Sequence, residues 1–331
     1  MHSIAVFNNK GGVGKTTFLC NLAASLSYHK GMKVLVVDAD PQCNATQYMF
    51  GLPRISEIYD DNEFTLLDVM KPLSQGKGYV EELIVTESPR FNVDVIPGDP
   101  GMSLEEDRLA TDWVQGTGGD IRGLRTSFVF AQLLSQCEDY DFVFFDMGPS
   151  LGSINRAVLV ATDFFIVPMS TDIFSVKAVE NISHSLSNWK KKLVRAIDDI
   201  GDGVSDLEID NPGWNLQFLG YLTQQYLTKT IRGKKQPVNA FEKIIKEIPK
   251  EINKRLVTPF TEKPRPKSSF AIGSIPLLNS LVPLAQTGNC PIFDLKSKDG
   301  VVGAHFSKVR EYGEIIEGIC EKFLTQCEAL A

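Results

Sequence analysis

The sequence predicts an α/β fold, in which a mostly parallel, twisted sheet carries helices on both faces. Short runs rich in Val, Ile and Phe alternate with longer stretches of helical periodicity. The short runs are apolar at nearly every position, as is typical of parallel strands that are covered on both faces. Because strands and helices alternate without an internal repeat or a low-complexity segment, the pattern favours a doubly wound sheet.

The predicted elements extend through all 331 residues, and we expect one domain over residues 1–331. Two regions fit the sheet poorly: Asp99–Gly119, expected to be a loop with one short helix, and Pro259–Lys267, expected to be an exposed connector. Strands are predicted at Ile4–Phe7, Val34–Val37, Val93–Ile96, Phe142–Phe145, Phe164–Val167 and Phe218–Leu222. Helices are predicted at Thr16–Tyr28, Ile121–Cys137, Val176–Val194, Ala240–Arg255 and about 307–329.

The turn between the first strand and the first helix carries the clearest chemical signal. It contains the run Lys10, Gly11, Gly12, Val13, Gly14, Lys15, Thr16 and Thr17. Backbone N–H groups of such a turn can surround phosphates, and the helix N-terminus adds partial positive charge. Lys15 would neutralise the β- and γ-phosphates, and the Thr16 hydroxyl would bind Mg²⁺. An ordinary glycine turn with solvated lysines is the alternative, but the flanking strand and helix favour a P-loop NTPase.

Two further strands end in carboxylates at the edge where ligands bind in sheets of this kind. Asp38 and Asp40 follow the second strand, and a solvated strand-to-loop turn is the alternative interpretation there. Asp146 follows Phe142–Phe145, a pattern that is weak alone because many buried strands end in aspartate. Downstream of a phosphate loop, Asp146 is predicted to hold Mg²⁺ through water, because Mg²⁺ keeps several waters and takes few carboxylates.

The lysine-rich turn resembles the deviant Walker A motif of the ParA/MinD family of ATPases. Asn9 stands where the common phosphate loop has glycine, and Lys10 follows it. The resemblance is closest to ParA-type partition ATPases of the Soj kind. It implies ATP and Mg²⁺ as cofactors and an ATP-bridged homodimer in which Lys10 reaches the nucleotide of the partner subunit. It also implies that Asp40 positions the attacking water and that Asp38 supports the Mg²⁺ and the switch region.

On this family pattern Lys10, Lys15 and Asp40 are the catalytic residues, Thr16, Asp38 and Asp146 form the metal site, and slow ATP hydrolysis awaits a partner protein. Gly148 and Pro149 stand where family members usually have two prolines, so the local switch geometry differs.

Weaker matches continue in the C-terminal half, where backbone at Pro276 would contact adenine. They comprise Ile166–Pro168, a strand approaching the base at Gly220–Thr223, and a loop closing over adenine at Ile275–Pro276, Leu284–Ala285 and Gly288.

Composition describes an ordinary globular protein, with 43% hydrophobic and 23% charged residues. No apolar stretch approaches the roughly 20 residues that span a bilayer, and no signal peptide precedes the first strand. We therefore expect a cytoplasmic protein, associated with the nucleoid if it binds DNA. The six cysteines form no CxxC pair, which argues against an iron–sulfur cluster and favours buried thiols.

The formal charge of −7 is distributed unevenly. Between residues 225 and 267, twelve Lys and Arg stand against four Glu, which gives this segment about +8 and leaves about −15 elsewhere. The first hypothesis is DNA partitioning: the ATP dimer binds DNA nonspecifically through this enlarged basic segment at about 225–270, and a ParB-like activator triggers release. The solvated side of a surface helix is the alternative for the same charges. The candidate DNA contacts are Lys229, Arg232, Lys234, Lys235, Lys243, Lys246 and Lys250.

Two other hypotheses stay open. A membrane-positioning switch of the MinD type needs a basic amphipathic tail, but the last helix is acidic and anionic lipid would repel it. We therefore do not expect a membrane partner. An ATP-dependent switch for another cargo or effector protein is the third hypothesis, and the stretch at about 239–270 has no assigned role.

Overall fold

The computed structural model describes residues 1–226, 228–231, 234–237, 247–262, 270–278 and 280–330, without side chains at 225–246. Among these residues, eight strands form one sheet in the order β10-β7-β6-β1-β5-β2-β4-β3. All neighbouring pairs are parallel except β3 with β4. The α/β prediction is therefore confirmed. The strands are β1 (His2–Val6), β2 (Val34–Asp38), β3 (Thr86–Ser88), β4 (Val93–Ile96), β5 (Phe142–Asp146), β6 (Phe164–Ser170), β7 (Gln217–Tyr226) and β10 (Ala271–Pro276).

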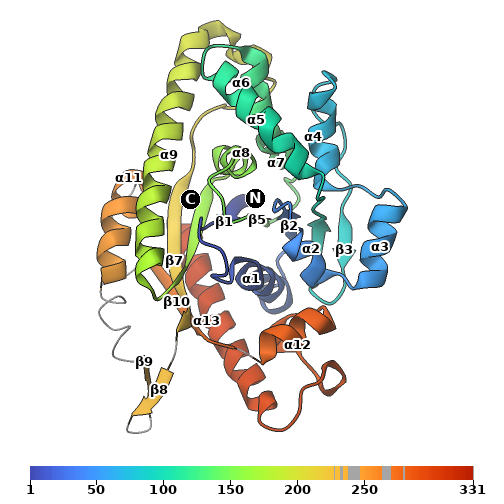
Figure 1. Cartoon of the computed structure of the whole chain (residues 1–331), viewed down its shortest axis with the longest axis vertical. Helices are drawn as coiled ribbons and strands as arrows, with labels where there is room; N and C mark the ends of the chain where they lie inside the picture. Colours follow the sequence, from blue (N-terminus) through green and yellow to red (C-terminus); the bar gives the residue numbers. More distant parts are fainter. Residues whose placement is uncertain (227, 232–233, 238–246, 263–269, 279, 331) are drawn as a thin grey trace.

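Helices cover both faces of the sheet, with α5–α8 on the upper side and α1, α12 and α13 on the lower side in Figure 1. A separate antiparallel hairpin joins β8 (Thr228–Ile231) to β9 (Lys234–Pro237). The longer helices are α1 (Lys15–Lys30), α5 (Met102–Gly116), α9 (Ile173–Ile200) and α13 (His305–Leu330). The shorter ones are α2 (Asn44–Met49), α3 (Leu52–Asp60), α4 (Leu66–Ser74), α6 (Ile121–Ser127), α7 (Val129–Ser135), α8 (Ser153–Ala161), α11 (Thr258–Phe260) and α12 (Leu281–Gly288). The 3₁₀ helices are η1 (Gly201–Leu207), η4 (Ile292–Asp294) and η5 (Ser297–Asp299), and η2 (Asn253–Val257) is a short π-helix.

Strand side chains alternate between two hydrophobic cores, one on each face of the sheet. On β5, Phe142 and Phe144 pack with α1 and α13, whereas Val143 and Phe145 pack with α5, α7, α8 and α9. Every residue of β5 is therefore buried, which explains why its sequence shows no polar alternation. The two cores fix the carboxyl edges of β1, β2 and β5, and these edges hold the candidate site.

Three local predictions were wrong. The segment 99–119 is mostly the helix α5, whose pattern was obscured because Leu104 and Val114 are exposed on it. The predicted helix at 121–137 is divided into α6 and α7 at Phe128, which leaves the helical region at ψ 11°. Residues 284–288 belong to α12 instead of a loop. Of the connector expected at 259–267, Pro259 and Glu262 are exposed and Phe260 is buried in a core, whereas residues 263–267 lie outside the described residues.

The C-terminal helix was predicted almost at its observed bounds, because Ile316, Ile319 and Phe323 form a buried stripe that packs on the sheet. No helix within the described ranges is long and apolar enough to cross a membrane. All six cysteines lie in described segments as free, buried thiols, as expected.

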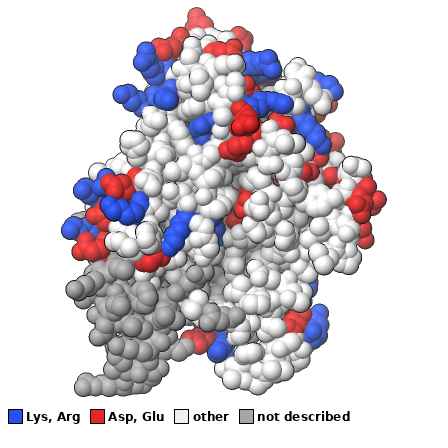
Figure 2. All heavy atoms as spheres, viewed as in Figure 1, with Lys and Arg blue, Asp and Glu red and all other residues white. Residues whose placement is uncertain are grey.

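The predicted DNA-contacting residues are only partly visible. Arg232, Lys243 and Lys246 lie outside the described residues, and Lys229, Lys234 and Lys235 are described as backbone of the β8–β9 hairpin. Lys250 is exposed, with its Nζ 3.7 Å from Glu247 Oε2. On the face in Figure 2, the coloured residues show basic and acidic side chains interspersed instead of one continuous basic patch.

Candidate nucleotide-binding site

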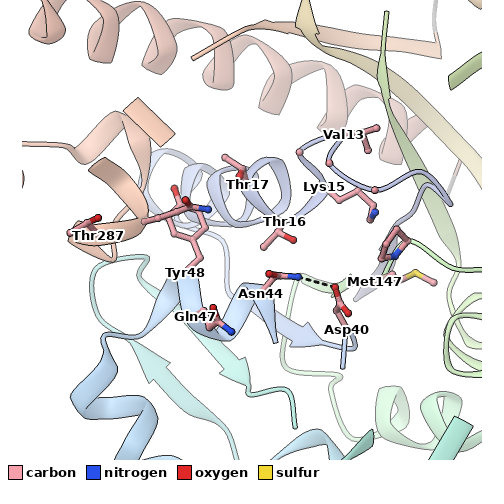
Figure 3. A pocket seen from close by; sticks show the side chains of 15 residues that line it. Val13, Lys15, Thr16, Thr17, Asp40, Asn44, Gln47, Tyr48, Met147 and Thr287 are labelled. Atoms are coloured by element: carbon pink, nitrogen blue, oxygen red, sulfur yellow. Dashed lines mark hydrogen bonds between the residues drawn. The ribbon is translucent and has the colours of Figure 1, made fainter. Parts of the chain in front are cut away.

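The glycine-rich turn wraps around a cavity at the carboxyl edge of the sheet. Gly12 and Gly14 have φ of 70° and 79°, in the left-handed region that favours glycine, and α1 begins directly after Gly14. The N–H groups of the first helical turn have no partner within the helix, so they are available to a phosphate. The cavity has a volume of ≈ 570 Å³ (Figure 3). Its lining comprises Gly11, Gly12, Val13, Gly14, Lys15, Thr16, Thr17, Asp40, Asn44, Gln47, Tyr48, Met147, Pro149, Gln286 and Thr287.

Lys15 is almost fully buried, with 7% of its surface exposed, yet it carries the charge that a phosphate needs. Its Nζ donates to the carbonyl oxygens of Asn8 at 3.1 Å and Lys10 at 3.4 Å. Burial lowers the pKa of Lys15, and the nearby carboxylates of Asp146 and Asp40 oppose that shift. The ammonium therefore lies inside the turn, at the position where it can meet the phosphates.

The residues predicted to bind Mg²⁺ lie together because of strand register. Asp146 ends β5 opposite Asp38, the last residue of β2. Thr16 Oγ1 donates to Asp146 Oδ2 at 2.7 Å, whereas the buried Asp146 Oδ1 has no hydrogen-bond partner. Burial, and next the charge of Asp38, raise the pKa of Asp146 well above its ordinary value. A cation beside Oδ1 would give this oxygen the partner that it lacks, and its positive charge would offset the cost of burying the carboxylate.

This donor set fits Mg²⁺. Within the described ranges, no group of three or more His, Cys, Asp and Glu side chains is arranged to hold a metal alone. Mg²⁺ does not need such a group, because it usually takes one or two carboxylates together with phosphate oxygens and water. Thr16 and Asp146 are the residues that would hold the ion, and the ion would supply charge neutralisation between the phosphates.

Asp38 uses both carboxylate oxygens inside the protein. Oδ2 accepts hydrogen bonds from the backbone N and the hydroxyl of Thr46, both at 2.7 Å, and Oδ1 accepts from Asp40 N at 3.3 Å. Burial raises its pKa to about 6, although the bonds from Thr46 oppose the shift. These contacts favour a supporting role, in which Asp38 fixes the start of α2 and the loop that carries Asp40.

Asp40 lies beyond the end of β2 and faces the cavity, 5% exposed. Asn44 Nδ2 donates to its Oδ2 and Gln42 N to its Oδ1, each at 3.0 Å, and Figure 3 shows the bond from Asn44. A Cβ at Gly148 would lie 3.0 Å from Asp40 Oδ1. The glycine that replaces a family proline therefore lets the loop after β5 approach this carboxylate closely.

A second, smaller cavity of ≈ 270 Å³ adjoins the first and shares Gly14 and Thr17 with it. Pro276, predicted to contact adenine, lies in its wall. Most other wall residues are apolar, as suits the flat face of a base; they are Phe18, Ile275, Leu277, Leu278, Val282, Pro283, Ile292 and Tyr312. The polar exception is Gln224, whose Nε2 donates to Gly14 O at 3.2 Å.

The turn, Lys15, Thr16, Asp38, Asp40 and Asp146 are thus brought together, and Pro276 adjoins them. Sequence reasoning missed Asn44, Gln47, Tyr48, Gln224 and the end of α12, which supplies Gln286 and Thr287. Asn289 holds that end in place, with Nδ2 at 3.0 Å from Phe50 O next to α2. The spacing of Asn44, Gln47 and Tyr48 after Asp40 is helical, but nothing local shows that this helix faces a cavity.

Gly14→Ala should weaken nucleotide binding by about 5- to 30-fold. An alanine at φ 79° is strained by about 1–2 kcal/mol, and its Cβ would lie 2.5 Å from Gln224 Oε1, so the Gln224 amide would have to move. Gly31→Ala is the matched control, because Gly31 caps the other end of α1 at φ 67° with no atom within 4 Å of its Cβ position. Titration with a fluorescent ATP analogue checks the expectation. Similar affinities for the two variants would contradict it.

Comparisons with known proteins agree with this site. A family model described as an AAA domain matches residues 1–198. An uncharacterized protein of Methanocaldococcus jannaschii is 28% identical over 223 residues, which cover 67% of this chain and 73% of that protein. The sporulation initiation inhibitor protein Soj of Bacillus subtilis is 30% identical over 190 residues, covering 57% of this chain and 66% of Soj. The chromosome partitioning protein ParA of Myxococcus xanthus is 29% identical over 190 residues, 57% of this chain and 59% of ParA. The match thus spans less than two thirds of Soj and of ParA.

Solved structures extend the similarity over nearly the whole chain. A protein from Corynebacterium diphtheriae has a TM-score of 0.75 and 28% identity, and the alignment covers 99% of both chains. A plasmid partition protein of Borrelia burgdorferi bound to AMPPNP has a TM-score of 0.61 at 20% identity, with 98% of this chain and 99% of that chain covered. The second of these shows the fold alone. The phosphate loop, its carboxylates and these relatives lead to one conclusion: the chain belongs to the ParA/MinD family of P-loop ATPases.

Proposed function

We propose that this protein is a Mg²⁺-dependent ATPase of DNA partitioning, which dimerises around ATP, binds DNA nonspecifically and releases it when a ParB-like partner stimulates hydrolysis. The observation that carries the proposal is the cavity that Lys15, Thr16 and Asp40 line. Membership of the ParA/MinD family supports nucleotide hydrolysis in general. The chromosome partitioning protein ParA, one of the relatives, supports the choice of partitioning within that family.

The side chains divide the proposed reaction among them. Lys15 and the N–H groups of the turn hold the phosphates, and Thr16 with Asp146 holds Mg²⁺, which supplies charge neutralisation when bound. Asp40 accepts a hydrogen bond from the attacking water and orients it toward the γ-phosphate. Hydrogen bonds from Gln42 N and Asn44 Nδ2 fix the orientation of its two carboxylate oxygens. The apolar cavity beside Pro276 takes the base.

The basic segment around the β8–β9 hairpin is the proposed DNA contact, because Lys and Arg bind phosphates without reading sequence. We expect the charge reversal Lys234→Glu with Lys235→Glu to weaken DNA binding and to reduce the slope of log affinity against log salt by about 2, since each lost phosphate contact removes about 0.9. Co-sedimentation with DNA in ATP, in ADP and without nucleotide is the measurement, with ATP alone expected to support binding.

Lys308→Glu with Lys322→Glu on α13 is the matched control, because both lysines are exposed and the net charge changes equally. Equal DNA binding by the two double variants would place the DNA contact elsewhere. Liposomes of anionic lipid belong in the same assay: liposome binding would favour a membrane switch, and binding to neither surface would favour another cargo or effector protein.

A further inference from the structure

The helix α8 begins directly after the loop that follows β5, and a side chain from another helix holds its N-terminus. The residue before α8, Gly152, supplies no side-chain cap. Glu106 on α5 takes that place, because its Oε1 accepts a hydrogen bond from Ser153 N and its Oε2 accepts one from Ile154 N at 3.2 Å. A carboxylate there satisfies N–H groups that the helix leaves free, and the helix dipole favours its charge. The position of α5 therefore determines where α8 begins.

The absence of a side chain at Gly152 makes this contact possible. A Cβ there would overlap Glu106 Oε1, so any larger residue would push the carboxylate away from the end of the helix. A second contact joins the same two helices. Arg156 on α8 donates from Nη2 to Leu109 O on α5 at 3.1 Å, and its guanidinium carbon lies 4.5 Å from the centroid of the Trp113 ring. The start of α8 is thus tied to α5 through both an anionic and a cationic side chain.

Asn155, in the first turn of α8, reaches back to the loop after β5. It is 3% exposed, and its Nδ2 donates to Gly148 O and to Ser150 O, each at 2.8 Å. Gly148 has no Cβ to restrict its backbone, so contacts from elsewhere have to hold this part of the loop. Loss of the amide would take this donor from a buried carbonyl oxygen, which is costly. The buried amide therefore fixes the loop to the start of α8.

The loop that Asn155 holds lies against the carboxylate that is proposed to orient water. The Cβ position of Gly148 is 3.0 Å from Asp40 Oδ1, and Met147 and Pro149 on either side of it line the nucleotide cavity. A shift of this loop would either crowd Asp40 or leave space beside it. A misplacement of about 1 Å near reacting groups can cost about 10²-fold in rate. The geometry around Asp40 thus depends on contacts made outside the cavity.

We propose that Glu106 and Asn155 are positioning residues for ATP hydrolysis, which hold the loop after β5 against Asp40. The inference rests on the proposed function. Asn155 acts on the loop directly, and Glu106 acts by fixing the first turn of the helix that carries Asn155. Neither residue lines the nucleotide cavity, so neither is placed to hold the phosphates or the base. Both therefore govern the hydrolysis step and leave the binding of ATP nearly unchanged.

Asn155→Ala should lower kcat for ATP hydrolysis by about 10- to 100-fold and change KM by less than about 2-fold. Glu106→Gln should lower kcat by about 3- to 10-fold, because glutamine keeps one acceptor oxygen but loses the charge and the second acceptor. Phosphate release over a range of ATP concentrations is the measurement. Glu105→Gln is the matched control on α5, where Glu105 pairs with Arg108 at 3.0 Å, and Asn181→Ala is an exposed control on α9. Both controls should keep the wild-type kcat.

The Asp40→Ala background separates positioning from general damage to the fold. Because Asn155 acts through the loop against Asp40, adding Asn155→Ala to Asp40→Ala should lower the remaining rate by less than about 2-fold, whereas general damage would lower both rates by the same factor. If Asn155→Ala does not fold, Glu106→Gln in the same two backgrounds carries the test.

Two outcomes would contradict the positioning role while the proposed function stands. The wild type hydrolyses ATP but the variants keep the kcat of their controls, or the variants lose the same factor with and without Asp40. A higher KM with unchanged kcat belongs to the first of these outcomes. If the wild type neither binds nor hydrolyses ATP, the proposed function and the positioning role are both overturned.

Discussion

Lys15→Ala should weaken the binding of MgATP by about 100-fold or more. A hydrogen bond to a charged group contributes about 1.5–3 kcal/mol, and every 1.4 kcal/mol is a factor of ten in affinity. We expect the lost binding free energy to lie at the upper end of that range, because Lys15 is nearly buried and water screens buried charges less. Isothermal titration calorimetry with a non-hydrolysable analogue measures the effect directly.

Lys30→Ala is the matched control for this variant. Lys30 ends the same helix, and its Nζ lies 3.7 Å from Glu321 in a partly exposed ion pair remote from the cavity. Such a pair contributes little to stability, so the control should bind nucleotide as the wild type does. Unchanged affinity in Lys15→Ala, with the fold intact by circular dichroism, would contradict the assignment of the phosphate loop.

The sequence predicts this site well where the chemistry is local. The eight residues from Lys10 to Thr17 are contiguous, and their glycines, lysines and hydroxyls determine both the backbone conformation and the charge of the turn. The carboxylates Asp38 and Asp146 were also predictable, because each ends an apolar strand. Parallel register then aligns the two strand ends without further information.

Residues that arrive from distant segments could not be predicted in this way. Gln224 contacts Gly14 only because β7 lies beside β6, and Thr287 reaches the cavity only because Asn289 holds α12 against the end of α2. The helix α5 was missed for a related reason: its buried side chains, such as Leu109 and Trp113, are interrupted by exposed Leu104. Periodicity cannot separate an apolar residue that packs from one that stays exposed.

Asp40→Ala should reduce the rate of ATP hydrolysis by about 10²- to 10⁴-fold while leaving ATP affinity close to that of the wild type. Among the described residues, Gln42 N and Asn44 Nδ2 donate hydrogen bonds to this carboxylate, which lines the cavity. Its loss therefore removes the group proposed to orient water without removing a phosphate contact. The proposed ATP dimer should then persist, because in the proposed cycle its dissociation depends on hydrolysis. Phosphate release under single-turnover conditions, together with dimer lifetime, is the measurement.

Asn44→Ala tests the orientation of the Asp40 carboxylate separately from its charge. It removes the donor at 3.0 Å that holds Oδ2, so the carboxylate remains but is less restrained, and a smaller loss of rate is expected than for Asp40→Ala. Asp60→Ala, an exposed change on α3, should leave the rate unaltered. If Asp40→Ala hydrolyses ATP at the wild-type rate, the water is oriented by another group. If Asn44→Ala is slower than Asp40→Ala, the amide itself contacts the reacting atoms, and Asp40 only holds it there.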